Sequence, residues 1–330
     1  MGNLYRGHND GFLANGRARA QSQRVTASVH NRPIMALLLR LLAAIVLSVM
    51  LAIVKLAGES GVHLAEIVFW RQVPTIFAIL GWLLLRGEVA RLKTTRVGAH
   101  ARRALIGLAS MALNFTAVMM LPLAEATTIV FTAAIWAVIL AAVLLKEKVG
   151  RYRWGAVALG FTGVLVITQP GGSDLPLLGA AIGLAAAMLI ALISVLIRDL
   201  GRTEEPITVV FYFSLFSLPI MGAILPFVYT PHTAEQWSML ASLAGLGLVA
   251  QLLLTASLRY GMVASVMVMD YTSLLWATLL GWGLFDRLPS ATTWLGAPLV
   301  IAAGVIVAWR EHRLARQDLA ALAREEGTNI

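Results

Sequence analysis

Hydrophobic residues along the chain gather into long blocks that are separated by short polar breaks. The blocks are about 20 residues long, the length with which an α-helix crosses the ~30 Å hydrocarbon core of a bilayer. Proline, glycine or charge marks the breaks, as in LPLAE, KEKVGR and DRLPS. The pattern predicts an all-α integral membrane protein with ten transmembrane helices, at residues 33–57, 66–85, 103–121, 123–145, 152–169, 177–197, 207–228, 238–258, 261–285 and 291–309.

Composition strengthens this prediction. Of the 330 residues, 59% are hydrophobic and 13% are charged, whereas a soluble domain is about half apolar and a quarter charged. The chain has no cysteine, which excludes disulfides, thiolate metal sites and cysteine nucleophiles.

The distribution of lysine and arginine sets the expected orientation. With the N-terminus in the cytoplasm, 22 of the 26 basic residues fall in cytoplasmic segments and only Arg287 falls in an outer loop. Positive charge collects on the cytoplasmic side of membrane proteins. We therefore expect both termini inside, and the net charge of +9 needs no nucleic-acid partner to explain it.

Polar segments flank the predicted membrane region at both ends. Residues 1–32 are basic, and the first apolar block is too long for the core of a signal peptide, so we expect a cytoplasmic tail. The segment at 311–330 has the pattern of an amphipathic helix, which predicts a cytoplasmic helix lying near the bilayer surface.

The chain contains an internal repeat. A displacement of 140 residues places IWAVILAAVLLKEKVG on LWATLLGWGLFDRLPS, so that Trp136 meets Trp276 and Ala137 meets Ala277. Because each half then holds five helices, the second half enters the membrane from the opposite side. Such inverted repeats, here 33–170 and 171–310, place the substrate site of transporters near the midplane between the halves.

The segments PLAEATTIVFTAAIWAVILAAVLLKEKVG and DYTSLLWATLLGWGLFDRLPS resemble the two EamA repeats of the drug/metabolite transporter superfamily. The resemblance implies a ten-helix carrier in a bacterial cytoplasmic (inner) membrane that moves small organic metabolites, such as amino acids, S-adenosylmethionine, riboflavin or metallophores. Arg287 departs from the family pattern, which commonly has glutamate there.

Motifs of known catalytic chemistry are missing from the sequence. It has no HExxH, no Walker-type phosphate loop and no GxSxG elbow, and its six histidines show no metal-ligand spacing. We expect neither an enzyme nor a cofactor. The Gly245-x-Gly247 pair fits close helix packing better than a nucleotide loop.

Asp270 is the only charge in the apolar run from Gly261 to Phe285. It would lie ~13–14 Å deep in a continuous helix, where an aspartate costs about 2.5–3.5 kcal/mol on insertion scales. Two interpretations stay open, a fixed hydrogen-bond or ion-pair network and a role in substrate contact or proton coupling. Tyr271 is placed to orient the carboxylate or a ligand.

The other charges inside the spans also have two interpretations. Arg71 either extends to the membrane surface or lines a cavity, where it binds a substrate carboxylate or pairs with Asp270. Because Lys55 is near a helix end, its side chain is expected to extend to the membrane surface. Arg40 is expected to anchor the cytoplasmic end of its helix. Glu66 and Glu125 begin outward-facing helices, where the helix dipole stabilises them.

Neutral side chains at depth complete the candidate set. Asn114 and Gln251 require hydrogen-bond partners in hydrocarbon, as contacts between helices or as ligands of a substrate. Trp136 and Trp276 lie away from the interfacial belts, which fits either core packing or aromatic walls around a flat or cationic ligand.

These features predict a secondary active transporter of a small organic metabolite, amino-acid- or nucleoside-derived and zwitterionic or aromatic, that works by alternating access. One chain holds both halves of the repeat, so we expect a functional monomer whose partners are its substrate and membrane lipid. The alternatives are a gradient-driven facilitator or exporter without proton coupling and, from another class, an intramembrane enzyme.

Overall fold

The computed structural model describes residues 33–144, 150–169, 175–201, 203–260 and 268–328, and the predicted basic tail at 1–32 lies outside these ranges. Regular structure in the described ranges is entirely helical. The elements are α2 (Pro33–Glu59), α3 (Leu64–Arg86), η1 (Val89–Leu92), α4 (Val97–Met120), α5 (Leu123–Val130), α6 (Ala133–Leu144), α7 (Arg151–Thr168), α8 (Leu177–Leu200), α9 (Pro206–Val228), α10 (Ala234–Tyr260), η2 (Val268–Thr272), α12 (Ser273–Phe285) and α13 (Ala291–Thr328).

The ten-helix prediction is confirmed, as two repeats of five spans. Eight stretches of the described residues are long and apolar enough to cross a membrane, and one of them combines α5 and α6. The shorter α7, with 18 residues, and α12, with 13, complete the two sets. The first repeat is α2 to α7 and the second is α8 to α13.

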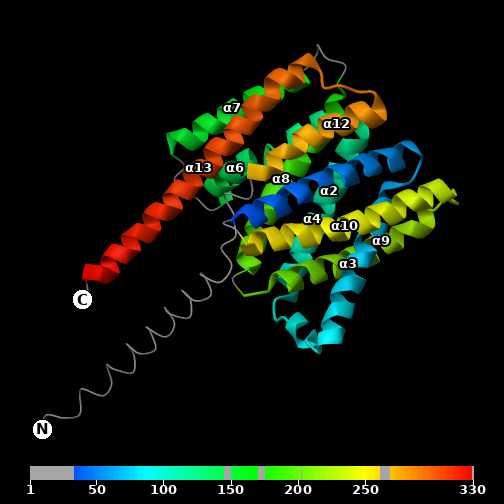
Figure 1. Ribbon diagram of the computed structural model, residues 1–330, viewed down its shortest axis with the longest axis horizontal. Coiled ribbons are helices and arrows are strands. Elements are labelled where there is room, and N and C mark those ends of the chain that lie inside the picture. Colours follow the sequence, from blue (N-terminus) through cyan, green and yellow to red (C-terminus); the bar gives the residue numbers. More distant parts are fainter. Residues whose placement is uncertain (1–32, 145–149, 170–174, 202, 261–267, 329–330) are drawn as a thin grey trace, which may run out of the picture.

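The two repeats interlock instead of standing side by side. The first span of each repeat packs against the third span of the other, as α2 on α10 and α8 on α4. The second spans, α3 and α9, pack together, and so do the fifth spans, α7 and α13. Figure 1 shows α2 beside α10 and the α7–α13 pair at one edge of the bundle. Neither repeat has a complete core of its own.

Glycine allows α7 and α13 to meet backbone to backbone. A Cβ on Gly163 would lie 2.8 Å from the carbonyl oxygen of Gly296, and a Cβ on Gly296 would lie 2.5 Å from the carbonyl oxygen of Gly163. Gly160 lies against Ala303 and Gly163 against Val300, and the 140-residue displacement exchanges these two contacts. The interface is thus self-complementary, and small residues bring the helices close.

The fourth and ninth spans are both broken at equivalent positions. A turn at Phe131 and Thr132 separates α5 from α6, and the 3-10 turn η2 precedes α12. Thr132 Oγ1 donates to the carbonyl of Ile129 (2.6 Å), and Thr272 Oγ1 donates to that of Met269 (2.7 Å). The predicted spans at 123–145 and 261–285 are thus interrupted at these turns, where the two hydroxyls satisfy backbone carbonyls of the last turn; residues 145 and 261–267 lie outside the described residues.

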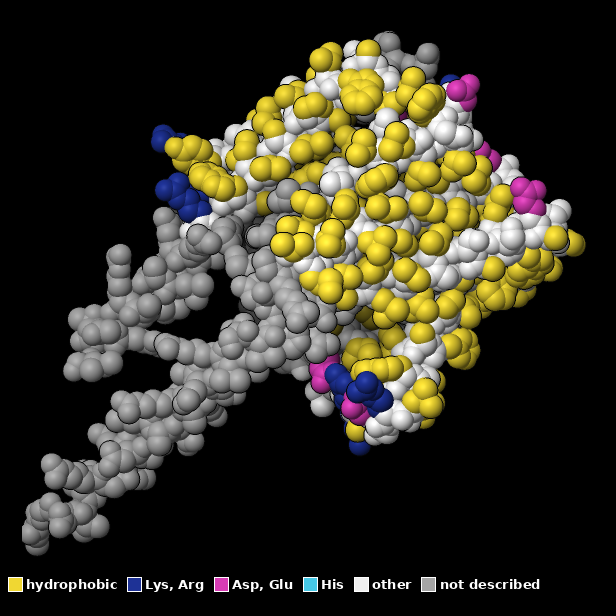
Figure 2. Space-filling view, viewed as in Figure 1, with side chains coloured by type: hydrophobic (Ala, Val, Ile, Leu, Met, Phe, Trp, Pro, Cys, Tyr) yellow, Lys and Arg dark blue, Asp and Glu magenta, His cyan; other side chains and the backbone are white. Residues whose placement is uncertain are grey.

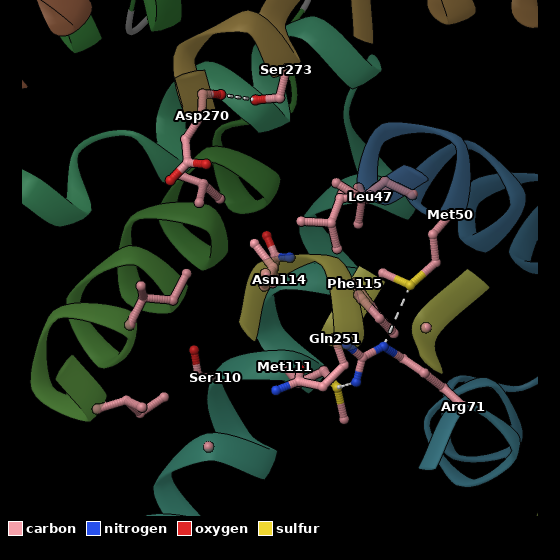
Figure 3. A pocket seen from close by; sticks show the side chains of 18 of the residues that line it. Leu47, Met50, Arg71, Ser110, Met111, Asn114, Phe115, Gln251, Asp270 and Ser273 are labelled. Atoms are coloured by element: carbon pink, nitrogen blue, oxygen red, sulfur yellow. Dashed lines mark hydrogen bonds between the residues drawn. The ribbon is translucent and has the colours of Figure 1, made fainter. Parts of the chain in front are cut away.

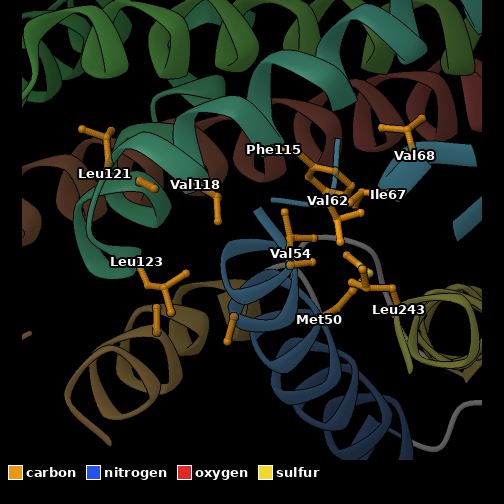
Figure 4. Packing of buried hydrophobic residues seen from close by; sticks show 14 of the residues in the cluster. Met50, Val54, Val62, Ile67, Val68, Phe115, Val118, Leu121, Leu123 and Leu243 are labelled. Atoms are coloured by element: carbon orange, nitrogen blue, oxygen red, sulfur yellow. The ribbon is translucent and has the colours of Figure 1, made fainter. Parts of the chain in front are cut away.

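The buried hydrophobic cluster lies where α2, α3, α4, α5 and α10 converge. Val54 of α2 packs among Phe115 and Val118 of α4, Ile67 of α3 and Leu243 of α10 (Figure 4). Lipid tails are as apolar as these side chains, so close van der Waals packing, and not removal from water, holds the helices together within the bilayer.

Polar contacts join the two repeats at one end of the bundle. Buried Glu66 of α3 pairs with His232, which precedes α10, and Glu125 of α5 accepts hydrogen bonds from Ser290 N (3.1 Å) and Thr293 Oγ1 (2.9 Å) at the start of α13. The helix dipole alone, which the sequence suggested for Glu66 and Glu125, therefore does not account for them.

The opposite end is joined by ion pairs that are exposed or half-exposed. Arg91 of η1 pairs with Glu205, and Arg96 pairs with Asp199. The hydrogen bonds that Arg91 donates to the carboxylates of Glu205 and Glu88 raise its pKa, so its charge is constant at physiological pH. Exposed pairs of this kind contribute little stability, about 0–1 kcal/mol each, and are easily broken when the ends separate.

Hydrophobic side chains cover most of the surface seen in Figure 2, whereas Lys and Arg gather mainly in two places, where α13 leaves the bundle and at the lower end of α3. That helix runs without interruption to Thr328 and projects away from the spans (Figure 1). The helix expected at 311–330 is therefore the continuation of the last span as far as Thr328, and its position near the bilayer surface stays a prediction.

We predict that Gly296→Ala destabilises the protein by about 1–3 kcal/mol, because the new methyl group meets fixed backbone and forces α7 and α13 apart. Gly81→Ala is the matched control, since a Cβ there meets nothing within 4 Å and alanine favours the helix. Thermal unfolding in detergent measures both. Equal melting temperatures for the two variants would contradict the close contact.

We predict that single cysteines at Ser60 and Thr230 react with an impermeant maleimide added outside intact cells, and that cysteines at Thr95 and Thr203 do not. All four positions are exposed, the native chain has no cysteine, and the basic residues place the second pair in the cytoplasm. Permeabilised cells provide the control, in which all four must react. The reverse pattern in intact cells would invert the topology.

Candidate functional site

A cavity of about 440 Å³ lies between the two repeats (Figure 3). Its described walls come from α2, α3, α4 and α5 of the first repeat and from α8, α9, α10, η2 and α12 of the second. In the described part of the chain α6, α7 and α13 contribute no wall residue. The fifth spans therefore form a scaffold beside the cavity.

Helical periodicity brings the polar residues of α4 to the cavity. Arg103, Gly107, Ser110 and Asn114 all line it, at the three- and four-residue spacing that puts side chains on one face of a helix. One stripe of α4 thus runs along the cavity.

Asp270 meets Arg40 in a two-pronged ion pair. Arg40 Nε donates to Oδ1 at 2.6 Å and Nη2 donates to Oδ2 at 2.5 Å, the bidentate geometry of a strong charge-assisted pair. The Arg40 side chain is 11% exposed and that of Asp270 is 37% exposed. The pair joins the first span of one repeat to the break in the ninth span.

This pair corrects two expectations. Arg40 is not a cytoplasmic anchor, because its guanidinium turns into the cavity to reach Asp270. The hypothesis that Arg71 pairs with Asp270 is wrong as well. Asp270 itself lies in η2 and not in the middle of a regular helix.

Arg71 lines the cavity from α3. Its Nη1 donates to Gln72 Oε1 at 3.1 Å and to the sulfur of Met111 at 3.2 Å, and its Nε contacts the sulfur of Met50 at 3.5 Å. Figure 3 shows the guanidinium among Met50, Met111 and Gln251. A Cβ on Gly247 would lie 3.0 Å from Arg71 Cγ. The glycine therefore leaves room for this side chain.

Arg103 is a second cationic group in the cavity, and the sequence had placed it at the cytoplasmic end of the third span, at its first residue. Helix α4 begins at Val97, six residues before the predicted start, which carries Arg103 into the bundle. Its guanidinium lies 4.2 Å from the ring centre of Phe213. Its buried Nε and Nη1 atoms have no hydrogen-bond partner within the described residues.

Neutral polar groups line the same cavity. Asn114 and Gln251 both lie in the wall, as expected for ligands or interhelical contacts. The atoms Asn114 Oδ1, Gln72 Nε2 and Ser214 Oγ are buried and lack a partner in the described part of the chain. Such atoms are available to a bound molecule. The described residues contain no cluster of three or more His, Asp or Glu side chains suited to a metal.

The aromatic candidates lie outside the described cavity lining. Trp136 packs edge-to-face on Phe161 with ring centres 5.6 Å apart, and Trp276 lies elsewhere on α12. Tyr271 packs edge-to-face on its repeat equivalent Phe131 at 5.0 Å and lies against Gly304. Trp136 and Tyr271 thus form packing contacts with other aromatic rings, and Tyr271 does not reach the Asp270 carboxylate with a described hydrogen bond.

Lys55 also lies outside the described lining, and its predicted extension to the surface is wrong. Its buried ammonium donates to the carbonyls of Val118 (3.3 Å), Met119 (3.4 Å) and Leu121 (3.0 Å). These carbonyls end α4 without helical partners, and a cation stabilises them. Lys55 thus caps a helix.

Two signals in the sequence pointed to the missed residues. A carboxylate at membrane depth requires a partner, and Arg40 lies seven residues inside its helix, too deep for a terminal anchor. Arg103 closes a series of polar and small residues, Arg103, Gly107, Ser110 and Asn114, at helical spacing. That series could have extended the third span backward.

Comparisons with known proteins agree with this architecture. The model of the EamA-like transporter family matches residues 34–169 and 177–309. The pseudopaline exporter CntI of Pseudomonas aeruginosa (strain UCBPP-PA14) is 29% identical over 270 residues, which are 81% of this chain and 93% of that protein. A riboflavin transporter of Vibrio cholerae serotype O1 is 24% identical over 88% of this chain and 98% of that protein. A solved crystal structure superposes with a TM-score of 0.55 at 19% identity, over 84% of this chain and 97% of that one, which supports the fold.

We predict that Asp270→Asn and Arg40→Gln each destabilise the protein by about 1.5–3 kcal/mol, because each leaves a partly buried charge without its partner. The double variant should lose less than the sum, since residues in contact couple. Asp199→Asn, which breaks an exposed pair, should cost under about 1 kcal/mol. Unfolding in detergent measures all four variants, and strictly additive losses would contradict a direct interaction.

Proposed function

This chain belongs to the EamA-like transporter family, and we propose that it is a secondary carrier that moves a small organic metabolite by alternating access through the cavity between its repeats. The coarser conclusion, a multi-pass small-molecule transporter and not an enzyme, follows from the family and from the exporter and transporter relatives. The mechanism and the roles of single residues are the proposal.

One observation carries the proposal: the Arg40–Asp270 pair connects the two repeats inside the cavity, at the break of the ninth span. A substrate cation or a proton that reaches Asp270 competes with Arg40 for the carboxylate. Such competition weakens the link between the halves. A ligand shifts a conformational equilibrium only as far as it binds one state more tightly than the other. Replacement of Arg40 at the Asp270 carboxylate by a substrate cation or a proton supplies that difference in binding.

The two ends of the bundle provide the elements that must open. The Arg91–Glu205 and Arg96–Asp199 pairs hold one end, and the Glu66–His232 and Glu125–Ser290 contacts hold the other. Alternating access requires one set to separate while the other stays closed. The α7–α13 scaffold and the α3–α9 contact allow the halves to rock, as inverted repeats do.

The cavity size suits a small organic molecule. A volume of about 440 Å³ falls in the range of small-molecule sites, ~300–1,000 Å³. Amino-acid- and nucleoside-derived metabolites, such as S-adenosylmethionine or riboflavin, fit this class. We further propose a functional monomer, because one chain holds both halves of the inverted repeat, with both termini in the cytoplasm of a bacterial inner membrane, because of the distribution of basic residues.

The second candidate is a facilitator that needs no proton gradient. The Arg40–Asp270 pair favours it in one respect, because an aspartate already neutralised by arginine needs no proton. Flux measured with and without a pH gradient separates the two candidates. In a proton-coupled carrier the gradient drives accumulation, whereas in a facilitator the substrate only equilibrates.

We predict that Asp270→Asn lowers transport per folded molecule at least about tenfold, the effect of one charge-assisted contact. The assay is uptake of radiolabelled amino acids, S-adenosylmethionine and riboflavin into proteoliposomes, with folded protein quantified by size-exclusion chromatography. Glu235→Gln, which neutralises an exposed carboxylate outside the cavity and outside both sets of end contacts, should transport as the wild type does. Full flux in Asp270→Asn would remove Asp270 from the mechanism, and absence of flux for every compound in the wild type would contradict the carrier.

A further inference from the structure

The charges in the cavity do not balance, and we infer that Arg71 and Arg103 together bind the carboxylate or phosphate groups of an anionic substrate. This inference rests on the proposed carrier function and names its substrate class. The described walls contain three arginines, Arg40, Arg71 and Arg103, and one carboxylate, Asp270. Because Arg40 is paired with Asp270, the other two guanidinium groups leave the walls cationic.

The partners of these two arginines are weak. Arg71 contacts two methionine sulfurs and a neutral amide oxygen, and Arg103 lies on the face of Phe213. Arg103 Nε and Nη1 have no acceptor within the described residues. A buried cation without an acceptor is unfavourable. An oxyanion from the substrate would supply the missing acceptors through the planar fork that suits carboxylate and phosphate.

The contacts of the two guanidinium groups lie one turn apart on α4. Arg71 Nη1 contacts the sulfur of Met111, and Arg103 Nη1 lies 3.4 Å from where a Cβ of Gly107 would be. Met111 and Gly107 are four residues apart on α4, one helical turn of about 6 Å. This placement suits a substrate with two acidic groups joined by a short linker, one group for each arginine.

Two glycines make this arrangement possible. A Cβ on Gly107 would lie 3.0 Å from the Phe213 ring and crowd Arg103, and a Cβ on Gly247 would crowd Arg71. Gly107 lies one turn from Arg103 on α4, and Gly247 of α10 faces Arg71, so each arginine has a glycine beside it that leaves space for its side chain. The glycines, the weakly partnered arginines and the neutral polar atoms around them form a built site.

The rest of the wall indicates what else the substrate carries. Leu47, Met50, Phe115 and Val118 give the cavity an apolar side, while Asn114 Oδ1 and Ser214 Oγ offer hydrogen bonds. These groups fit an organic acid with an aliphatic or aromatic body. A substrate amine, where present, would meet Asp270 at the other end of the site (Figure 3).

Thermal stabilisation of the detergent-purified protein tests the charge preference. The probes are succinate, its neutral diamide succinamide and the dication putrescine, which share a four-carbon chain, with potassium chloride at equal ionic strength. A ligand stabilises the folded state in proportion to RT ln(1 + [L]/Kd). We expect succinate to raise the melting temperature and the other probes to leave it unchanged. Stabilisation by putrescine or succinamide alone would overturn the inference.

Variants locate the binding. Arg71→Gln and Arg103→Gln should each raise the apparent Kd for succinate at least about tenfold, and Arg103→Lys should retain part of the affinity because it keeps the charge but loses the fork. Arg102→Gln is the matched control, since it removes the same charge from the exposed neighbour. Equal affinity in all variants would place the anion elsewhere.

Two further experiments distinguish a lipid headgroup from a soluble anion, and the anion-site proposal from the carrier proposal. In nanodiscs, loss of the succinate effect when phosphatidylglycerol replaces phosphatidylcholine would assign the arginines to a lipid headgroup and overturn a soluble substrate.

In proteoliposomes, exchange of labelled succinate by the wild type supports both proposals. Uptake of only neutral or cationic compounds would keep the carrier and overturn the anion site. Arginine-dependent binding without any flux would keep the site and contradict the carrier.

Discussion

The Arg40–Asp270 ion pair is the interaction on which the cavity depends. The ninth span is broken at η2, so Asp270 lies where the regular ladder of helical hydrogen bonds is interrupted. The carboxylate of Asp270 is also a charge that hydrocarbon disfavours. Arg40 resolves both problems, because its bidentate contact neutralises the carboxylate and fastens the break to the first span of the other repeat. An isolated Asp270 would have to be protonated or solvated, and the position of the break would no longer be fixed.

Much of the fold could be predicted from the sequence, because each spanning helix is required to be about 20 apolar residues long. The Trp136–Trp276 match located the repeat. The helix breaks could not be predicted in this way, since they are local turns at Phe131–Thr132 and at η2 within otherwise apolar runs, accompanied by hydroxyl contacts of Thr132 and Thr272 to backbone carbonyls. Hydropathy measures only length and apolarity and gives no information about such local bonds.

The candidate site was predicted less completely. Asp270, Arg71, Asn114 and Gln251 were singled out because polar atoms at depth require partners, and all four line the cavity. Which cation pairs with which anion depends on the packing of helices that are far apart in the sequence. The positions of the charges along the sequence therefore favoured Arg71 over Arg40 as the partner of Asp270. Lys55, by the same reasoning, was expected to reach water, whereas the exposed carbonyls at the end of α4 provide a nearer partner.

The broken spans meet at Phe131 and Tyr271, residues that the repeat makes equivalent. One position earlier, Val130 in the first repeat corresponds to Asp270 in the second. The backbone is thus nearly symmetric across the membrane while its chemistry is not. A fully symmetric carrier would offer identical sites to its two faces and would work equally well in reverse. Here the carboxylate belongs to one half and the three cavity arginines to the other, so we expect that the symmetry of the repeats does not make the inward- and outward-facing forms equivalent in substrate affinity.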